Sequence, residues 1–88
     1  MKLALGMIET NAIPVGVNAG DAMLKAATVE LVAAQPVCAG KYIVIVTGEV
    51  AAVRAAVSAG EKVPEAQGML SESVVIPSPH PDIIKSLY

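Results

Sequence analysis

Residues 42–57 read YIVIVTGEVAAVRAAV, a β-branched run that changes after Gly48 into a helical pattern. The first part, residues 42–47, is the strongest strand signal in the chain, because β-branched and aromatic side chains favour extended backbone. Glu49 then suits the first turn of a helix, where a carboxylate complements the helix dipole. The valines that follow recur on one helical face: Val50, Val53 and Val57. The stretch therefore predicts a strand and a helix, and we expect Gly60 to end that helix.

The residues before this stretch predict a strand, a helix and a second strand. Apolar residues alternate with smaller ones across residues 3–8, which favours a strand with one face on the core. Pro14 is typical of a helix start, and we expect this helix to span Val15 to Ala27. Its apolar and small residues recur on one face: Val17, Gly20, Leu24 and Ala27. β-Branched residues return in residues 28–33 and predict the next strand.

The residues after the stretch complete one domain over residues 1–88. Pro64 and Gly68 indicate a loop over residues 61–68, and residues 69–76 then predict a fourth strand. Prolines follow, and residues 82–87 are enough for a short terminal helix. The order β-α-β-β-α-β predicts an α+β fold of the split βαβ, ferredoxin-like kind, with both helices on one face of a mainly antiparallel sheet.

The composition points to self-association. The chain has 88 residues, of which 55% are hydrophobic and only 2% aromatic. A domain this short has too little interior to bury so many small apolar side chains, and oligomerisation is a common supplement to its stability. The excess is expected in close-fitting contacts between copies of the chain. We therefore expect a homo-oligomer.

Charge and hydropathy exclude several classes of partner. A net charge of −2 and only two tyrosines leave neither a basic footprint nor an aromatic platform for nucleic acid. No apolar run approaches the roughly 18 residues of a membrane span. The opening apolar segment meets Glu9 too soon for the core of a signal peptide. We expect a cytoplasmic protein with no nucleic-acid or membrane partner.

Cys38 is the only cysteine, and it lies in the turn between the second and third predicted strands. One thiol cannot hold a metal centre, but several copies of the chain could do so if they met around an axis at this turn. The alternative is a small apolar side chain with a structural role, as free cysteines often are. The residues taken alone favour that alternative.

Other candidate residues carry less chemistry. His80 could be a metal ligand or a pH sensor, but no second histidine exists, and an edge or capping role is expected. Glu9, Asp21 and Glu30 lie on different predicted elements, and no spacing pairs two of them for acid–base catalysis. The sequence contains neither a nucleophile-elbow nor a phosphate-loop pattern. We therefore expect a protein that is not an enzyme.

Several segments, taken in order, resemble the shell domain of bacterial microcompartments. They are LGMIET (residues 5–10), GDAMLKAA (20–27), VELV (29–32), VIVTGEV (44–50) and VRAAV (53–57). The resemblance runs from about Leu3 to Leu87. It implies a cyclic homo-hexamer with a central pore, which tiles with other shell proteins into a layer around a set of enzymes. It also implies a location in the microcompartment shell.

In that family the turn after the second strand lines the pore. The residues at that place are Pro36, Val37, Cys38, Ala39, Gly40 and Lys41. This Pro-x-Cys-x-Gly-Lys turn resembles the subset of shell proteins that hold an iron–sulfur cluster on the symmetry axis. The resemblance implies that Cys38 is a metal ligand, with a [4Fe-4S] cluster as one form. Such a cluster commonly takes four thiolates, so six symmetry-related thiols would exceed its need, and the nuclearity stays open.

Two neighbours of Cys38 suit that chemistry. Lys41 could partly offset the negative charge of a thiolate-bound cluster. Ala39 and Gly40 are small enough to let backbones approach closely.

The resemblance also implies a set of residues at the hexamer edge. Lys25 matches a lysine that meets its counterpart across a two-fold contact, and the alternative is an ordinary solvated lysine. Ser78 stands where the family usually has an arginine, before His80, and Thr28 stands where an asparagine is common. Tiling is therefore less strongly predicted than hexamer formation, and the chain could need other shell proteins beside it.

Three functional hypotheses follow. The first is a structural shell protein whose pore binds an iron–sulfur cluster through Cys38, for electron transfer or cluster supply across the shell. The second is an ordinary shell hexamer whose pore conducts small polar metabolites. The third, of a different class, is a regulatory oligomer that binds a small molecule between subunits, which the lack of a phosphate loop weakens.

Overall fold

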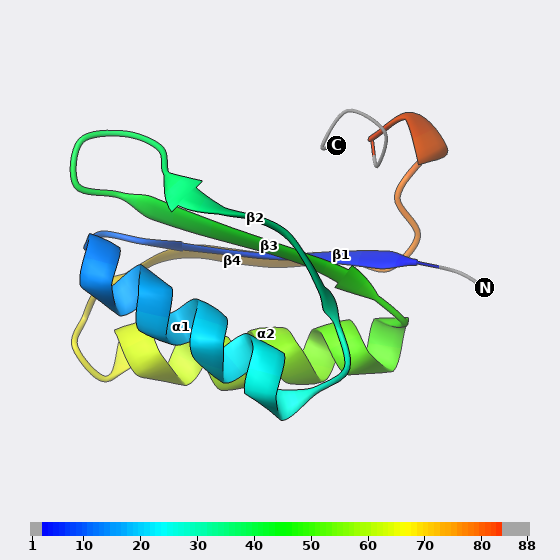
Figure 1. The fold of residues 1–88 in the computed structure, drawn as a ribbon, viewed down its shortest axis with the longest axis horizontal. Coiled ribbons are helices and arrows are strands. Elements are labelled where there is room, and N and C mark those ends of the chain that lie inside the picture. The colour runs from blue at the N-terminus through cyan, green and yellow to red at the C-terminus, as the bar shows by residue number, and fades with distance from the viewer. Residues whose placement is uncertain (1–2, 84–88) are drawn as a thin grey trace.

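The computed structural model describes residues 3–83 and shows a four-stranded antiparallel sheet with two helices on one face (Figure 1). The spatial order of the strands is β2-β3-β1-β4. The predicted α+β fold, with its order β-α-β-β-α-β, is confirmed. The elements are β1 (Ala4–Thr10), α1 (Ile13–Ala26), β2 (Glu30–Pro36), β3 (Tyr42–Gly48), α2 (Val50–Glu65) and β4 (Leu70–Ile76).

The core lies between the two central strands and the helices. Alternate residues of β1 and β3 face the helices, because successive side chains of a strand point to opposite faces. The buried apolar cluster consists of Ala4, Ile8, Met23, Val44, Val46, Val53, Ala56 and Val57. Gly6 lies under α2, where a Cβ would come within 2.6 Å of Val57 Cγ2. The predicted valine face of α2 is therefore confirmed as the face that packs on β1.

The predicted end of α2 is wrong. The helix passes Gly60 and continues to Glu65, with Pro64 inside it, so most of the loop expected over residues 61–68 is helical. Gly60 serves close packing instead, because a Cβ there would lie 2.5 Å from Met23 Cγ and 2.6 Å from Ile8 Cδ1. The chain leaves the helix through Gly68, whose φ of 66° suits glycine.

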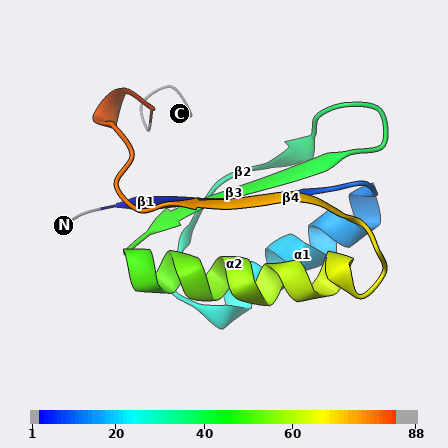
Figure 2. The same ribbon diagram turned by 180° about the vertical axis from the view of Figure 1, so that it is seen from behind.

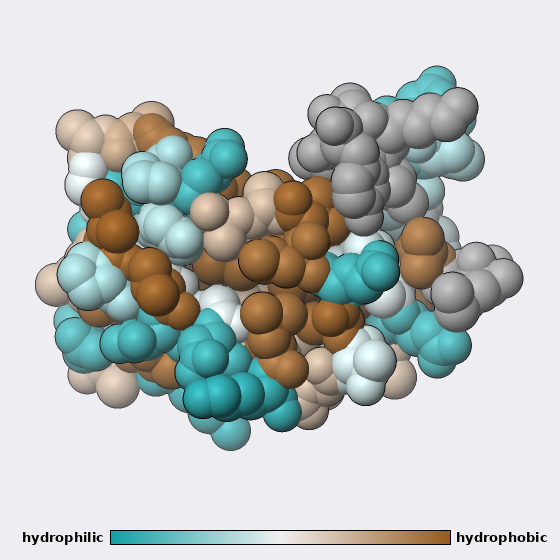
Figure 3. Space-filling view, viewed as in Figure 1, coloured by the Kyte–Doolittle hydropathy of each residue, from teal (hydrophilic) through white to brown (hydrophobic). Residues whose placement is uncertain are grey.

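Helix α1 buries only part of the face that the sequence pattern marks, because Gly20 is buried and Ala27 packs against the core whereas Val17 and Leu24 do not. Its buried residues include Val15, Ala19 and Met23. Val17 and Leu24, on the face predicted from spacing, are 51% and 43% exposed. They lie beside Leu31 of β2, which is 47% exposed, and apolar side chains gather over this part of the surface in Figure 3.

The molecule has two broad sides, and each carries one edge of the sheet. Its extents are 35 × 24 × 16 Å, and Figures 1 and 2 view it down the shortest axis from opposite directions. One side presents α1 and the edge strand β2 (Figure 1), and the other presents α2 and the edge strand β4 (Figure 2). If copies of the chain form a ring, one of these sides can pack against the other side of the next copy.

The segment after β4 turns to the face of the sheet that the helices leave open (Figure 2). Residues 81–83 are helical, which places the start of the predicted terminal helix, and residues 84–87 of that prediction lie outside the described residues. Leu5, Met7, Ile45, Val74, Ile76 and Ile83 line an apolar hollow there. Within residues 3–83 no helix has the length and hydropathy of a membrane span.

Candidate functional site

The turn that carries Cys38 closes the hairpin between β2 and β3. Pro36 at the end of β2 pairs with Tyr42 at the start of β3. The Lys41 N–H donates to the Cys38 carbonyl at 3.1 Å, and the Val37 N–H donates to the Lys41 carbonyl at 3.1 Å. Gly40 has a φ of 77°, which is the backbone conformation that a glycine at the third position of a tight turn supplies.

Cys38 is exposed at this turn, which projects from the sheet on the side away from the helices (Figure 1). Residues 36–40 are all exposed, and a Cβ at Gly40 would meet nothing within 4 Å. Gly40 is thus needed within one chain for its φ, and the close approach expected of Ala39 and Gly40 is not made inside the chain. The thiol is open to contact from outside the chain.

Lys41 is held on the sheet by Glu9 of β1. Its Nζ lies 3.8 Å from Glu9 Oε1, and the Ser71 Oγ of β4 donates to the same carboxylate oxygen at 2.9 Å. The turn is therefore tied across β1 to β4. Because Glu9 balances the Lys41 ammonium, the cation expected to offset a thiolate cluster already has a partner within the chain.

One chain supplies one thiol at this turn. Across residues 3–83, no three histidine, cysteine or acidic side chains come together as a metal site. The iron–sulfur cluster that the sequence implies therefore does not fit a single chain, and any such cluster needs thiols from further copies.

The residues expected at a hexamer edge lie in two separate places. Lys25, in the last turn of α1, and Thr28, just after that helix, lie toward the helical layer. Ser78 and His80 follow β4 on the segment that turns to the open face of the sheet (Figure 2). All four residues are exposed. A single chain does not bring the two pairs together.

Lys25 is paired within its own helix. Its Nζ lies 2.8 Å from Asp21 Oδ2, four residues earlier. The hydrogen bond and the charge of Asp21 raise the pKa of Lys25 above its ordinary 10.5. At neutral pH this lysine is therefore a permanent cation that shares its charge with Asp21.

His80 caps the helical turn that follows it. Its Nδ1 accepts the Asp82 N–H at 3.1 Å, at the helical turn that starts at Pro81. This arrangement agrees with the capping role that the sequence analysis expected for it.

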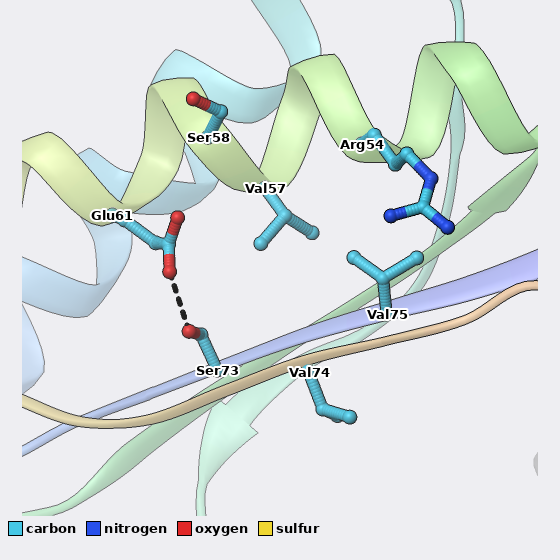
Figure 4. Close-up of a pocket in the computed structure, with 7 residues that line it drawn as sticks. All are labelled: Arg54, Val57, Ser58, Glu61, Ser73, Val74 and Val75. Atoms are coloured by element: carbon cyan, nitrogen blue, oxygen red, sulfur yellow. Dashed lines mark hydrogen bonds between the residues drawn. The ribbon is translucent and has the colours of Figure 1, made fainter.

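A hollow of about 280 Å³, which no sequence pattern predicts, lies between α2 and β4 (Figure 4). Its lining residues are Arg54, Val57, Ser58, Glu61, Ser73, Val74 and Val75. Ser73 Oγ donates to Glu61 Oε2 and closes one end, while the Arg54 guanidinium extends over Val75 at the other. No sequence motif marks these residues, because α2 and β4 meet only in the folded chain.

A second hollow, of about 240 Å³, lies on the opposite side between α1 and β2. Val17, Leu24 and Leu31 form its exposed apolar margin, and Asp21 is its charged residue. The two broad sides of the molecule thus each carry a shallow hollow, which is mainly apolar between α1 and β2 and of mixed polarity between α2 and β4. One holds an arginine and a glutamate, and the other holds an aspartate.

A family model described as the BMC domain matches residues 4–79. The chain is 43% identical over 84 residues to the bacterial microcompartment shell protein PduA of Citrobacter freundii. This alignment covers 96% of the present chain and 90% of PduA. The chain is also 44% identical over 80 residues to the shell protein EutM of Salmonella typhimurium, across 91% of this chain and 83% of EutM.

Two longer proteins match over about half of their length. The shell protein PduT of Citrobacter freundii is 37% identical over 87 residues, which are 99% of this chain and 46% of PduT. The crystal structure of a microcompartment protein from Desulfitobacterium hafniense superposes with a TM-score of 0.92 at 40% identity, and this chain spans 47% of it. PduA and EutM are therefore close to this chain in length, whereas this chain spans about half the length of these two.

Proposed function

The chain belongs to the family of bacterial microcompartment shell proteins, and we propose that six copies close into a ring with the Cys38 turns around its axis. The role of this ring is structural, as a unit of the shell, and the chain is not an enzyme. Other shell proteins are its neighbours in that layer.

The observation that carries this proposal is the placement of unburied apolar surface on the broad side formed by α1 and β2. A closed ring is built from heterologous contacts, in which one surface of each copy meets a different surface of the next. The exposed margin of Val17, Leu24 and Leu31 on one side is the apolar surface that such a contact would bury. Its burial accounts for the surplus of small apolar residues in a chain of this length.

The ring is tested by native mass spectrometry and electron microscopy of the purified protein. The expected result is a species of six times the 8.9 kDa chain mass that appears as a ring and, at high concentration or with other shell proteins, as flat layers. A chain that stays monomeric, or discrete particles that form only with a metabolite, would favour the regulatory hypothesis over the shell.

An iron–sulfur cluster at the centre of this ring is the finer part of the proposal. Supporting it are the exposure of Cys38 at the tip of the hairpin and the turn that its neighbours form. Thiolates are the ligands that such clusters take, and the cluster would supply one-electron redox chemistry. The chain's own part is to present the thiol. The six copies together would provide more thiols than one cluster uses.

The cluster is tested by anaerobic reconstitution of the ring with iron and sulfide. The expected product is brown, with visible absorption and a fixed iron content per ring, and Cys38→Ser abolishes both while leaving the ring intact. A colourless ring after reconstitution, or equal iron in the Cys38→Ser variant, would remove the cluster and leave the shell assignment untouched.

A pore for small polar metabolites is the second candidate. It is favoured by the balance of charge at the turn, where Glu9 pairs with Lys41, and by the lack of any group of three possible metal ligands among the described residues. In this case the turn would present backbone groups and an incidental thiol. The same reconstitution experiment separates the two, because a conduit stays colourless.

A further inference from the structure

We propose that the α2–β4 hollow of each copy receives the α1–β2 side of the neighbouring copy, with the Arg54 guanidinium bound to the Asp21 carboxylate of that neighbour. This inference rests on the proposed ring and names the contact that closes it. The occupant is a second copy of this chain.

Arg54 is the charged group in the α2–β4 hollow that lacks a partner among the described residues. Among the residues that the structure describes, no hydrogen bond or ion pair involves its guanidinium, although Glu61 in the same hollow is engaged by Ser73. Figure 4 shows the guanidinium lying over Val75, on the open side of the hollow. Arginine carries a planar fork of donors that matches a carboxylate and is enriched where interfaces bury charge.

Asp21 is the matching anion on the opposite side. It lies at the margin of the α1–β2 hollow, among the exposed residues Val17, Leu24 and Leu31. Its Oδ2 is taken by Lys25, whereas its Oδ1 makes no hydrogen bond to any described residue. A carboxylate accepts several hydrogen bonds, so this second oxygen is free for an arginine.

The positions of the two hollows fit a head-to-tail contact. They lie on opposite broad sides of a molecule whose thinnest extent is 16 Å, so a copy stacked side against side brings one hollow to the other. The α1–β2 hollow is mainly apolar, whereas valines and polar side chains share the lining of the α2–β4 hollow. Arg54 and the Asp21 oxygen that Lys25 leaves open are opposite in charge. The apolar walls of the α1–β2 hollow would exclude water from an ion pair and strengthen the attraction between the charges.

The inference is tested by charge reversal on the full chain. R54E and D21R are each expected to raise the protein concentration needed for half-assembly on the order of tenfold, as for a charge pair at an interface. The combined R54E/D21R variant restores most of the loss, because the pair is rebuilt in the opposite sense. The matched controls are K62E on α2 and E30R on β2, whose exposed side chains line neither hollow. They are expected to assemble as the wild type does.

A second measurement covers the case in which the reversals disturb folding. In a Cys38→Ser background, R54C and D21C are combined in one chain and treated with a short bismaleimide. Neighbouring copies are then expected to link into a ladder that ends at the hexamer, whereas K62C with E30C gives far less product.

The outcomes separate this inference from the proposed function. A wild-type ring in which R54E and D21R behave as the controls, or in which the double variant shows no recovery, overturns the Arg54–Asp21 contact alone. A wild-type chain without any ring overturns the proposed function and this inference with it.

Discussion

Glu9 is the residue that connects the Cys38 turn to the rest of the sheet. Its carboxylate lies between Lys41 from the turn and Ser71 from β4, so one side chain of β1 contacts both the turn and β4. This role of Glu9 was not predicted, because nothing in the spacing of the sequence shows that Lys41 lies across the strand. Solvent-exposed pairs of this kind contribute about 0–1 kcal/mol to stability, so the effect of Glu9 is on the position of the turn rather than on the fold.

Glu9→Gln is therefore expected to loosen the turn without unfolding the protein. The neutral amide keeps an oxygen for Ser71 but no longer attracts the Lys41 ammonium, so amide hydrogen exchange at Cys38–Lys41 speeds up. The free energy of unfolding falls by less than about 1 kcal/mol. Glu72→Gln is the matched control, because Glu72 faces Glu9 across β1 and β4 but forms no ion pair with the turn among the described residues. Unchanged exchange in the Glu9 variant would show that the ion pair does not hold the turn.

Two glycines of α1 show how closely the helices and the sheet approach each other. At Gly16 a Cβ would come within 2.6 Å of Tyr42 Cβ and 2.7 Å of Thr10 Oγ1. At Gly20 the nearest atom would be Val44 Cγ2 at 3.4 Å, which is close to ordinary contact. A side chain larger than that of glycine is therefore excluded at Gly16, whereas Gly20 has room for a Cβ, although both residues lie in the same helix.

Gly16→Ala and Gly20→Ala are expected to move stability in different directions. Alanine gains about 1 kcal/mol over glycine inside a helix. At Gly16 the overlap with Tyr42 Cβ, which no rotamer can relieve, costs about 1–3 kcal/mol and outweighs that gain. At Gly20 the gain remains. Denaturant unfolding of both variants at the same low protein concentration measures the difference, and equal midpoints would contradict the packing that the structure shows.

The helices also show which parts of the fold can be predicted from the sequence. The order, number and approximate bounds of strands follow from β-branched runs and turn residues, which are local signals. The end of α2 was wrong because Gly60 is a contact point for Met23 and Ile8, and a glycine kept for packing cannot be told from one that ends a helix. The outward face of α1 was misjudged for a related reason, since Val17 and Leu24 have core-like chemistry but lie where another copy can bury them.

In the candidate site, too, one part was predicted from the sequence and another part was not. The Cys38 turn was located from its neighbours in the sequence, and the hairpin confirms its position. The α2–β4 hollow was not predicted, because Arg54 and Ser73 are brought together only by the strand order β2-β3-β1-β4. The ion pair of Lys41 with Glu9 was missed for the same reason.

The whole molecule is a flat unit with a hairpin at one end and a different hollow on each broad side. Its surface chemistry is incomplete in a single copy, since Arg54 has no partner among the described residues and the apolar margin of α1 and β2 stays in water. Arg54 gains a partner and the apolar margin is buried if one broad side of each copy covers the opposite broad side of the next copy around a ring. The same packing decides whether six thiols approach one another.

An electron-microscopy reconstruction of the purified, assembled protein tests this packing most directly. The account predicts a six-fold ring in which the α1–β2 side of each copy covers the α2–β4 side of the next and every Cys38 points toward the axis. A ring with the hairpins at its outer rim, or copies joined through the open faces of their sheets, would contradict it.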